Sequence, residues 1–249
     1  MNVFITGASS GLGAALARHY GGQGATLGLV GRREDGLAAT AGGLDARLYR
    51  ADVRDADAMH RAAQAFLDTG GAPDIVIAAA GISVGTLTEI SADATVFRAV
   101  MDANVLGLVH TFQPFVGHMR AGGVLCGISS VAGLRGLPGG GAYSASKAAA
   151  TIYLEALRLE LKGRGIAVVN VAPGYIDTPM TRVNPYPMPF KMSAEAAAAK
   201  TARCIARRRP YTVIPWQMSL VGRMLKWLPI PVYDAVFEKA PRKPRGLPT

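Results

Sequence analysis

Short runs of apolar residues alternate along the chain with longer segments in which apolar residues recur every three to four positions. The apolar runs predict strands, and most of them are apolar throughout, as expected for parallel strands that are buried on both faces. The longer segments predict amphipathic helices. The predicted strands are Asn2–Thr6, Ala25–Val30, Ala46–Ala51, Asp74–Ala79, Gly123–Ser129, Ile166–Ala172 and Tyr211–Ile214. The predicted helices are Leu12–Gln23, Glu34–Ala41, Ala56–Asp68, Asp93–Arg120, Tyr143–Lys162, Ala194–Arg208 and Trp216–Leu228.

This alternation is typical of an α/β fold. We expect a Rossmann-type, doubly wound sheet of seven mainly parallel strands with helices on both faces. The 249 residues suit one such domain and no interior linker divides them, so a single domain is expected over residues 1–249. Residues 173–249 are expected to form a proline-rich substrate loop up to Lys191, a lid helix and a basic C-terminal tail, which is loose from Pro241 to Thr249.

The net charge of +10 is concentrated at one end of the chain. Eleven Lys and Arg residues but only two acids lie between Lys200 and Thr249, while the first 199 residues are close to neutral. No nucleic-acid recognition motif accompanies this charge, so we expect no nucleic-acid partner. Contact with an anionic lipid surface and a merely solvated tail are both compatible with it.

Cysteine and histidine usage argues against two other classes of protein. Cys126 and Cys204 lie far apart and outside any Cys-x-x-Cys pair, and the four histidines show no metal-ligand spacing. We therefore expect neither a disulfide framework nor a metal site. No targeting peptide is apparent at the start, and no apolar run reaches the ~18 residues of a membrane span. These features favour a cytoplasmic protein.

A glycine-rich loop, Thr6-Gly7-Ala8-Ser9-Ser10-Gly11-Leu12-Gly13, joins the first predicted strand to the first helix. Gly7 and Gly11 would let the backbone turn and approach a pyrophosphate, and Gly13 would let the helix pack closely on the strand. The helix N-terminus would then offer free N–H groups and a positive dipole to the phosphates. The alternative is a purely structural turn, because the spacing G-x-x-x-G-x-G is not the commoner G-x-G-x-x-G.

Two arginines, Arg32 and Arg33, follow the second predicted strand, where an NAD site carries an acid for the ribose 2′-hydroxyl. Guanidinium groups there would pair with the 2′-phosphate of NADP, which predicts NADP(H) as the cofactor. The alternative is a solvated pair partly neutralised by Glu34. Asp52 and Val53, at the end of the third strand, would lie beside the adenine or else belong to the start of the next helix.

A tyrosine and a lysine four residues apart, Tyr143 and Lys147, open a long predicted helix. Residues at this spacing share one helix face, so the phenol and the ammonium would reach the same volume. A nearby ammonium lowers the pKa of a tyrosine, which could then exchange a proton with a carbonyl oxygen. Ser130, at the end of the fifth strand, would face the same crevice because ligands bind beyond the carboxyl ends of parallel strands.

Together these motifs resemble the short-chain dehydrogenases/reductases, in their shorter single-domain branch, over roughly residues 1–181. The resemblance implies that Tyr143 is the catalytic acid/base and that Ser130 binds the substrate oxygen. It implies that Lys147 binds the nicotinamide ribose and lowers the pKa of the tyrosine, and that Asn104, in Asp-Ala-Asn-Val, holds a proton-relay water.

The same resemblance assigns cofactor contacts. The segment Pro173-Gly174-Tyr-Ile-Asp-Thr178 matches the family's P-G-x-x-x-T, in which Ile176 and Thr178 would contact the nicotinamide carboxamide. The expected cofactor-binding set is Gly7, Ser9, Ser10, Gly11, Leu12, Gly13, Arg32, Arg33, Asp52, Val53, Ala80, Gly81, Tyr143, Lys147, Pro173, Gly174, Ile176 and Thr178. One motif departs from the family: Ala78-Ala79-Ala80-Gly81 stands where N-N-A-G or N-A-A-G is usual, so the asparagine that steadies the central sheet is missing.

The activity implied is that of an NADP-dependent carbonyl reductase that interconverts a small-molecule ketone and a secondary alcohol by hydride transfer. The family habit implies a homodimer or homotetramer through the helices Asp93–Arg120 and Tyr143–Lys162. A non-catalytic NADP-binding regulator and a peripheral membrane reductase of lipid metabolism are the alternatives.

The helix Trp216–Leu228 holds both tryptophans of the chain. Its polar and small residues fall on one narrow stripe: Ser219, Gly222, Arg223 and Lys226. Such a helix would be a core or lid helix over the substrate cleft, an oligomer face, or a peripheral membrane contact. The proline-rich loop is apolar as well, through Met180, Met188, Phe190 and Met192. These features favour a hydrophobic or lipid-like substrate.

Overall fold

The computed structural model describes residues 1–246 and holds one seven-stranded parallel sheet with the order β3-β2-β1-β4-β5-β6-β7. Its strands are β1 (Asn2–Thr6), β2 (Thr26–Gly31), β3 (Ala46–Arg50), β4 (Ile75–Ala78), β5 (Val124–Ile128), β6 (Ala167–Pro173) and β7 (Tyr211–Ile214). Each predicted strand is present, with ends that differ by at most one residue. The Rossmann-type fold is confirmed, and the strand order reverses between β1 and β4, which is where ligands bind in such sheets.

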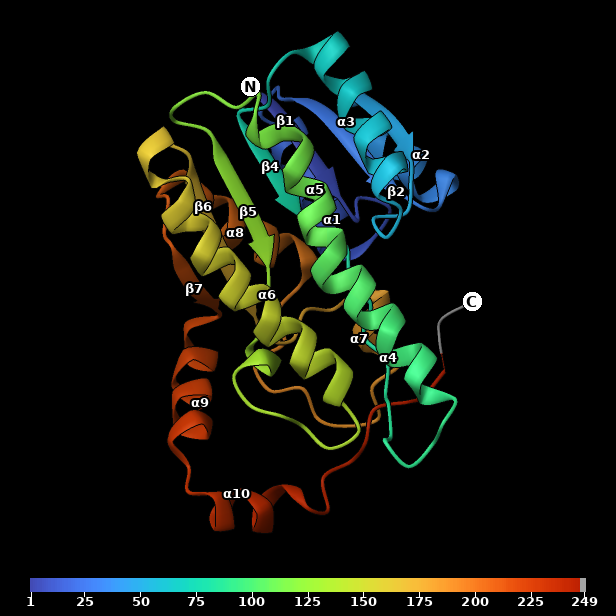
Figure 1. Ribbon diagram of the computed structural model, residues 1–249, viewed down its shortest axis with the longest axis vertical. Helices are drawn as coiled ribbons and strands as arrows, with labels where there is room; N and C mark the ends of the chain where they lie inside the picture. Colours follow the sequence, from blue (N-terminus) through green and yellow to red (C-terminus); the bar gives the residue numbers. More distant parts are fainter. Residues whose placement is uncertain (247–249) are drawn as a thin grey trace.

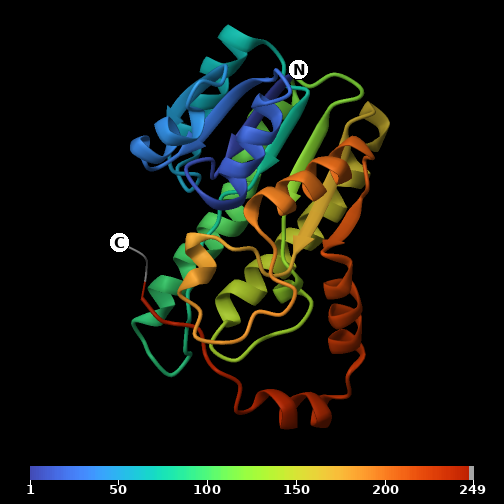
Figure 2. The same cartoon turned by 180° about the vertical axis from the view of Figure 1, so that it is seen from behind.

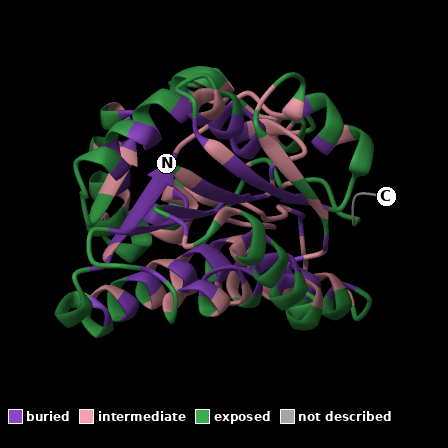
Figure 3. Ribbon diagram, turned by 90° about the horizontal axis from the view of Figure 1, so that it is seen from above, coloured by how far each residue is buried: buried purple, intermediate pink, exposed green. Residues whose placement is uncertain are grey.

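Helices cover both faces of the sheet (Figures 1 and 2). On one face lie α1 (Gly11–Gly21), α2 (Glu34–Ala41) and α8 (Ala194–Ala206). On the other lie α3 (Ala56–Gly70), α5 (Gly107–Val116) and α6 (Gly141–Glu160). A buried core fills the space on each side, as the purple strands between the two helical layers in Figure 3 show. Because neighbouring strand residues point into opposite cores, the strands carry no polar alternation.

The two cores are anchored by side chains that alternate along β1. Val3 and Ile5 belong to the core beneath α1 and α8, whereas Phe4 points to the opposite core. There the Phe4 ring packs edge-on against Phe66 of α3 and Phe115 of α5, with ring centres 5.3 and 4.6 Å apart. Such aromatic packing fixes the two helices on the central strands and so holds the carboxyl ends of those strands in place.

The prediction of a single helix over Asp93–Arg120 is wrong, because this segment does not form one continuous α-helix. The structure has α4 (Asp93–Met101), a π-helical turn η1 (Asp102–Leu106) and then α5, which ends at Val116. The wider turn carries Asn104, whose side chain bonds both backbone groups of Ile82. A π-turn inserts an extra residue into a helix without ending it, and periodicity alone does not show it.

Two helices were not predicted. α7 (Pro179–Arg182) is a single turn inside the proline-rich loop, which was expected to be irregular. Its signal was present in the sequence, because Thr178 is a good N-cap and Pro179 takes the first helical position. The second is α10 (Ile230–Phe237), held to α9 (Trp216–Trp227) through Arg135. The Arg135 guanidinium donates to the carbonyls of Leu225 and Leu228 and stacks on Tyr233.

The exposed side chains of α9 bear on its three interpretations, namely a core or lid helix, an oligomer face and a membrane contact. Only Met218 and Gly222 of this helix are buried, and they pack against Gly174 and Leu134. Trp216 and Trp227 are 66% and 83% exposed, and two further apolar side chains of the helix, Leu220 and Met224, are exposed as well. The glycine of the predicted polar stripe is thus buried, while much of the apolar face is open. α9 is therefore not a core helix, and its interpretations as a lid, an oligomer face or a membrane contact stay predictions. No helix within residues 1–246 is long and apolar enough to cross a bilayer.

The prediction of a loose tail is wrong for residues 241–246, which we call the C-terminal tail. Arg245 forms a bidentate ion pair with Asp93 of α4, at 2.8 and 2.9 Å, and the N–H of Gly85 donates to the carbonyl of Pro244 at 2.8 Å. Figure 2 shows the segment returning from α10 toward α4. Proline and charge content alone do not reveal such long-range partners. The last residues of the predicted tail, Pro248 and Thr249 among them, lie outside the described part of the chain.

Candidate active site

The glycine-rich loop packs too closely for side chains at its glycines. Gly7 has φ +72° and its missing Cβ would lie 2.7 Å from the backbone of Ala80. Gly11 has φ +56° and a Cβ there would lie 3.2 Å from the Thr178 side chain, while a Cβ on Gly13 would lie 2.2 Å from the Gly7 carbonyl oxygen. These contacts set the start of α1 directly against the ends of β1 and β4.

The start of α1 fits a phosphate group. Ser10 takes the N-cap position in extended backbone but makes no side-chain cap bond, and the first turn holds no acid. The first N–H groups of the helix are therefore left without a side-chain acceptor and carry the positive end of the helix dipole. Ser9 and Leu12 complete the turn on either side. A nicotinamide dinucleotide would place its pyrophosphate here.

We expect Gly13→Ala to prevent close packing of α1 on β1 and to lower the free energy of unfolding by about 2–4 kcal/mol, because backbone atoms cannot move aside as a flexible side chain can. Chemical denaturation would measure it. Gly117→Ala is the matched control, since its Cβ would meet nothing within 4 Å. Equal stability of the two variants would contradict the packing argument.

The two predicted arginines lie at the edge of this loop. The Arg33 guanidinium donates to the carbonyl of Ser9 at 3.1 Å, so it reaches over the glycine-rich turn, and the Arg32 side chain is exposed beside Asp52. No ion pair to Glu34 is formed among the described residues. Both guanidiniums are therefore available to an anionic group at the end of β2.

Asp52 lies beyond the end of β3 and its carboxylate holds Arg54 at 2.7 Å. That partner keeps the pKa of Asp52 below its usual range against the opposing effect of partial burial. The N-cap of α3 is Asp55, which accepts from the Ala58 N–H at 2.9 Å. The backbone of Val53 is tied to His110 of α5 at 2.8 Å. The backbone after β3 is thus held in place beside the glycine-rich loop.

Ser130, Tyr143 and Lys147 come together at the carboxyl ends of β5 and β6. Ser130 follows β5 as the N-cap of the short turn η2 (Val131–Gly133), with its hydroxyl accepting from the Ala132 N–H at 3.2 Å. α6 begins two residues before Tyr143 and presents it and Lys147 one turn apart on the same face. The Lys147 ammonium donates to the Ile128 carbonyl at 2.8 Å and lies 5.9 Å from the centre of the Tyr143 ring.

Burial dominates the acid–base properties of this group. It raises the pKa of Tyr143 above its ordinary value, and the Ser130 side chain only partly offsets this by hydrogen bonding. The prediction that Lys147 lowers the pKa of the tyrosine stays a prediction. Burial of the Lys147 ammonium lowers its own pKa to about 8.

The buried ammonium should destabilise the fold at neutral pH. Its pKa is lower folded than unfolded, so this cost is present in full below about pH 8 and is relieved as the pH rises toward 10, where only the unfolded chain retains the proton. We expect Lys147→Met to raise the free energy of unfolding by about 1–3 kcal/mol at pH 7. Denaturation curves at pH 7 and pH 10 would measure it, with exposed Lys162→Met as control. A Lys147 variant less stable than the control at pH 7 would refute the burial argument.

Asn104 of the π-turn is 1% exposed and has partners at both ends of its amide. Its Oδ1 accepts from the Ile82 N–H at 2.8 Å, and its Nδ2 donates to the Ile82 carbonyl and to Ser146 Oγ, both at 2.9 Å. The bond to Ser146 ties η1 to α6 one residue before Lys147. Gly81 is essential to the arrangement, because a Cβ there would lie 2.8 Å from Asn104 Oδ1 and 3.6 Å from Lys147 Nζ.

At the end of β4, Ala78-Ala79-Ala80-Gly81 makes apolar contacts where the family motif usually has an asparagine. Ala78 is buried, and Ala80 lies directly against Gly7 of the glycine-rich loop. A buried polar link exists elsewhere in the sheet, where Ser129 donates to Asn170 of β6 at 2.6 Å. The backbone of Ala80 and Gly81 thus lies directly against the glycine-rich loop and Asn104.

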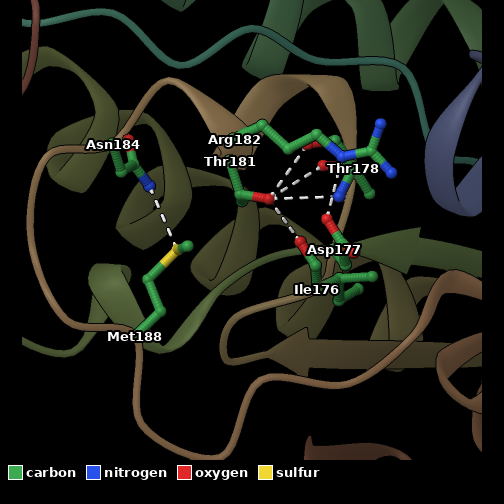
Figure 4. Close-up of polar contacts among 7 residues, drawn as sticks. All are labelled: Ile176, Asp177, Thr178, Thr181, Arg182, Asn184 and Met188. Atoms are coloured by element: carbon green, nitrogen blue, oxygen red, sulfur yellow. Dashed lines mark hydrogen bonds and ion pairs between the residues drawn. The ribbon is translucent and has the colours of Figure 1, made fainter.

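The end of β6 and the segment after it bring Pro173, Gly174, Ile176 and Thr178 to the same edge of the sheet. The Thr181 hydroxyl donates to the Ile176 carbonyl, and Arg182 binds Asp177 at 3.0 Å, as Figure 4 shows. A cavity of about 310 Å³ opens there, lined in part by Gly11, Pro179 and Arg182. It lies between the start of α1 and the segment expected to hold the nicotinamide.

Three side chains at the site were not predicted. The ring centres of Tyr175 and Tyr186 lie 6.5 Å apart, and both rings lie close to Tyr143. In addition to burial, Tyr175 raises the pKa of Tyr143, and Tyr143 raises the pKa of Tyr186. The third is Lys243 of the C-terminal tail, whose ammonium lies 5.4 Å from the centre of the Tyr143 ring. Tyr175 stands inside the quoted Pro-Gly-Tyr segment and so had a positional signal. Tyr186 and Lys243 had none, because long-range folding of loop and tail places them.

Comparison with known proteins identifies the family. The sequence model described as short chain dehydrogenase matches residues 1–186. A Myxococcus xanthus protein named as an uncharacterized oxidoreductase is 37% identical over 238 residues, which cover 93% of this chain and 94% of that protein. The 11-beta-hydroxysteroid dehydrogenase A of Arachis hypogaea is 37% identical over 187 residues, covering 72% of this chain and 53% of that protein.

Among solved structures, a short chain dehydrogenase/reductase SDR from Burkholderia phymatum in complex with NAD is similar along the whole fold. It has a TM-score of 0.81 at 26% identity and covers 99% of this chain and 98% of its own. The match over residues 1–186, together with a relative of 37% identity along almost its whole length, shows that this chain belongs to the short-chain dehydrogenase/reductase family of oxidoreductases.

Proposed function

We propose that this protein is an NADP-dependent carbonyl reductase that interconverts a ketone and a secondary alcohol, working as one NADP-binding domain. The observation that carries the proposal is the meeting of Ser130, Tyr143 and Lys147 beside the glycine-rich loop, with Asn104 bound to the same elements. A protein that only bound the cofactor would need the loop but not this proton-handling group.

Each side chain has a definite part in the proposed reaction. NADPH, when bound, supplies the hydride. Ser130 and Tyr143 donate hydrogen bonds to the carbonyl oxygen, where negative charge develops. Tyr143 then gives its proton to that oxygen, and Lys147 and Asn104 position the path by which the proton is replaced. A tyrosine phenol is protonated at neutral pH, and burial raises the pKa of Tyr143 further, so the side chain carries the proton that this step requires.

The preference for NADP(H) rests on Arg32 and Arg33. Their guanidiniums carry no ion pair to Glu34 and stand at the end of β2, where the ribose of a dinucleotide lies in this fold. The Burkholderia phymatum structure was solved with NAD, so fold alone does not favour NADP. Two cations at this edge recognise a 2′-phosphate, which NAD lacks.

The substrate is proposed to have an apolar body. Met180 and Phe190 of the loop around α7 are 38% and 50% exposed, and Tyr175 and Tyr186 add aromatic surface beside Tyr143. One relative is named for a hydroxysteroid, an apolar secondary alcohol. Flexible methionine side chains adapt to apolar molecules of different shape.

Assembly into a homodimer or homotetramer is proposed through α4, η1 and α6. Phe97, Leu106, Ile152 and Leu159 are exposed apolar side chains on these helices, and Ile152 and Leu159 are the most open, at 66% and 61%. Burying such side chains in a symmetric interface removes apolar area from water.

A peripheral membrane reductase is the second candidate. The open apolar faces of α9 and α10 carry Trp216, Trp227 and Ile230 together with the basic residues Arg223 and Lys226. Tryptophan and basic side chains together suit an anionic lipid interface. Sedimentation with phosphatidylserine-containing vesicles tests it, because a reductase that works free in the cytoplasm stays in the supernatant.

The proposed activity is tested by following NADPH oxidation with ketones of rising chain length. We expect turnover to increase with chain length. NADPH binding without turnover of any ketone would support the non-catalytic regulator instead, and a preference for short polar ketones would overturn the proposed apolar substrate.

A further inference from the structure

The C-terminal tail is fixed beside Tyr143 of the candidate active site. Arg245 is held by the buried carboxylate of Asp93, which also accepts from the Leu87 N–H at 2.8 Å. The tail backbone pairs with Gly85 of the loop after β4, and a Cβ on Gly85 would lie 2.2 Å from the Lys243 carbonyl oxygen. On the other side, a Cβ on Gly139, just before α6, would lie 2.9 Å from the Arg242 side chain. The tail is thus clamped between the two segments that flank Tyr143.

These contacts of the tail hold one cation, the Lys243 ammonium, beside Tyr143. The Lys243 ammonium donates to Ser83 Oγ at 2.6 Å and lies 5.4 Å from the centre of the Tyr143 ring. Lys147 reaches the same ring from α6, at 5.9 Å. Lys243 therefore belongs to the same volume as the proton-handling group, although it lies far beyond Tyr143 in the sequence.

The ammonium of Lys243 has no matching negative charge in the described part of the chain. The ion pairs there join Arg18 to Glu195, Arg54 to Asp52, Arg182 to Asp177, and Arg245 to Asp93, so no carboxylate among residues 1–246 lies within 4 Å of it. Ser83 takes one of its three N–H donors. Partial burial lowers the pKa of Lys243 to about 8, so the group is still mostly charged at pH 7.

The Lys243 ammonium is half-buried beside the Tyr143 phenol and has N–H donors without an acceptor in the described part of the chain. Such a cation contributes little to stability, but it is well placed to bind an anion. Its three anchors, at Asp93, Gly85 and Gly139, hold the ammonium in place before any ligand arrives, which reduces the entropy lost on binding. Docking of the tail does not require a lysine at this position, since Arg245 and the backbone already hold it.

We infer that Lys243 is a specificity-determining residue that binds an oxyanion of the substrate, so that the substrate is an oxo acid whose carboxylate lies a few bonds from the reacting carbonyl. This deepens the proposed function and rests on it. The apolar body would lie against the loop around α7, while the carboxylate would point to the tail.

The test compares matched substrates that differ only in charge. 4-, 5- and 6-oxodecanoate and their methyl esters are offered with NADPH to the full chain and to Lys243→Met. The unaltered protein is expected to prefer at least one acid over its ester by about tenfold or more in kcat/KM, the usual size of one charge-assisted hydrogen bond. Lys243→Met is expected to lose that preference, mainly through a higher KM for the acid, so that the ratio of the kcat/KM values for acid and ester falls to about one.

Two further variants separate charge recognition from tail packing. Lys239→Met removes the same charge from an exposed position on the chain leading into the tail and should keep the preference for the acid. Lys243→Arg keeps a cation and should restore part of it. Thermal unfolding of all variants shows whether the fold is intact, and calorimetric binding of the corresponding hydroxy acids gives a readout independent of turnover.

The outcomes distinguish the two proposals. If acids and esters are reduced equally by the unaltered protein, or if Lys243→Met changes both alike, the anion site is refuted while the reductase stands. If simple ketones are reduced but no oxo acid is, the anion site is refuted as well. If no ketone, acid or ester oxidises NADPH, the proposed reductase itself fails.

Discussion

Replacing Tyr143 by phenylalanine is expected to lower kcat for ketone reduction about 10³-fold, within the range found for loss of a positioned general acid. The physical reason is that the phenol is the proton donor to the carbonyl oxygen in the proposed mechanism. Ser130 can still donate a hydrogen bond but cannot supply the proton at neutral pH. Steady-state NADPH oxidation measures the loss, and NADPH affinity should change little because the ring remains.

Tyr153 provides the matched control on the same helix. It lies further along α6 and packs at the edge of the core beneath α3 and α5. Tyr153→Phe removes the same hydroxyl away from the site and should keep full activity. If Tyr143→Phe retained more than about a tenth of the activity, Tyr143 would not be the acid, and the proposed mechanism would be wrong.

Exchange of both Arg32 and Arg33 for serine is expected to raise KM for NADPH about 100-fold and to leave KM for NADH nearly unchanged. Each charge-assisted hydrogen bond to the 2′-phosphate contributes about 1.5–3 kcal/mol, and partial exposure reduces that figure, so two of them give roughly two decades. The effect should shrink as the salt concentration rises, because both side chains are exposed and the attraction is screened.

The control for this cofactor test is Arg61→Ser, an exposed arginine on α3. It lowers the net charge without touching the end of β2. Equal increases in KM for NADPH and NADH in the double variant would show a general loss of binding, and an unchanged KM for NADPH would contradict the assignment of the two arginines to the 2′-phosphate.

The sheet was predictable because buried parallel strands leave a strong local signal. β1 and β7 begin and end at the predicted residues, since β1 is followed by Gly7 and β7 lies between Pro210 and Pro215. The catalytic-type residues were equally local: Tyr143 and Lys147 share a helix face through their spacing, and Ser130 follows a strand. Periodicity carries such information directly.

The remaining features depend on partners far along the chain. The π-turn at Asn104 forms around the backbone of Ile82, and burial in the folded chain raises the pKa of Tyr143. The docking of the tail requires Asp93 and Gly85, and the pairing of Asp93 with Arg245 spans 152 residues of sequence. No local pattern encodes these contacts, so the sequence alone predicted a loose tail where the fold places a cation in the site.

Transfer of deuterium from NADPH that carries deuterium at both positions of the nicotinamide C4 to the carbonyl carbon of a long-chain ketone tests the central claim most directly. Mass spectrometry of the product alcohol would detect it. We predict one deuterium at the carbinol carbon with the unaltered protein and with Tyr153→Phe, and almost none with Tyr143→Phe over the same time. An alcohol without deuterium, or labelled product formed as fast by Tyr143→Phe, would contradict the assignment of this site as a Tyr143-dependent reductase.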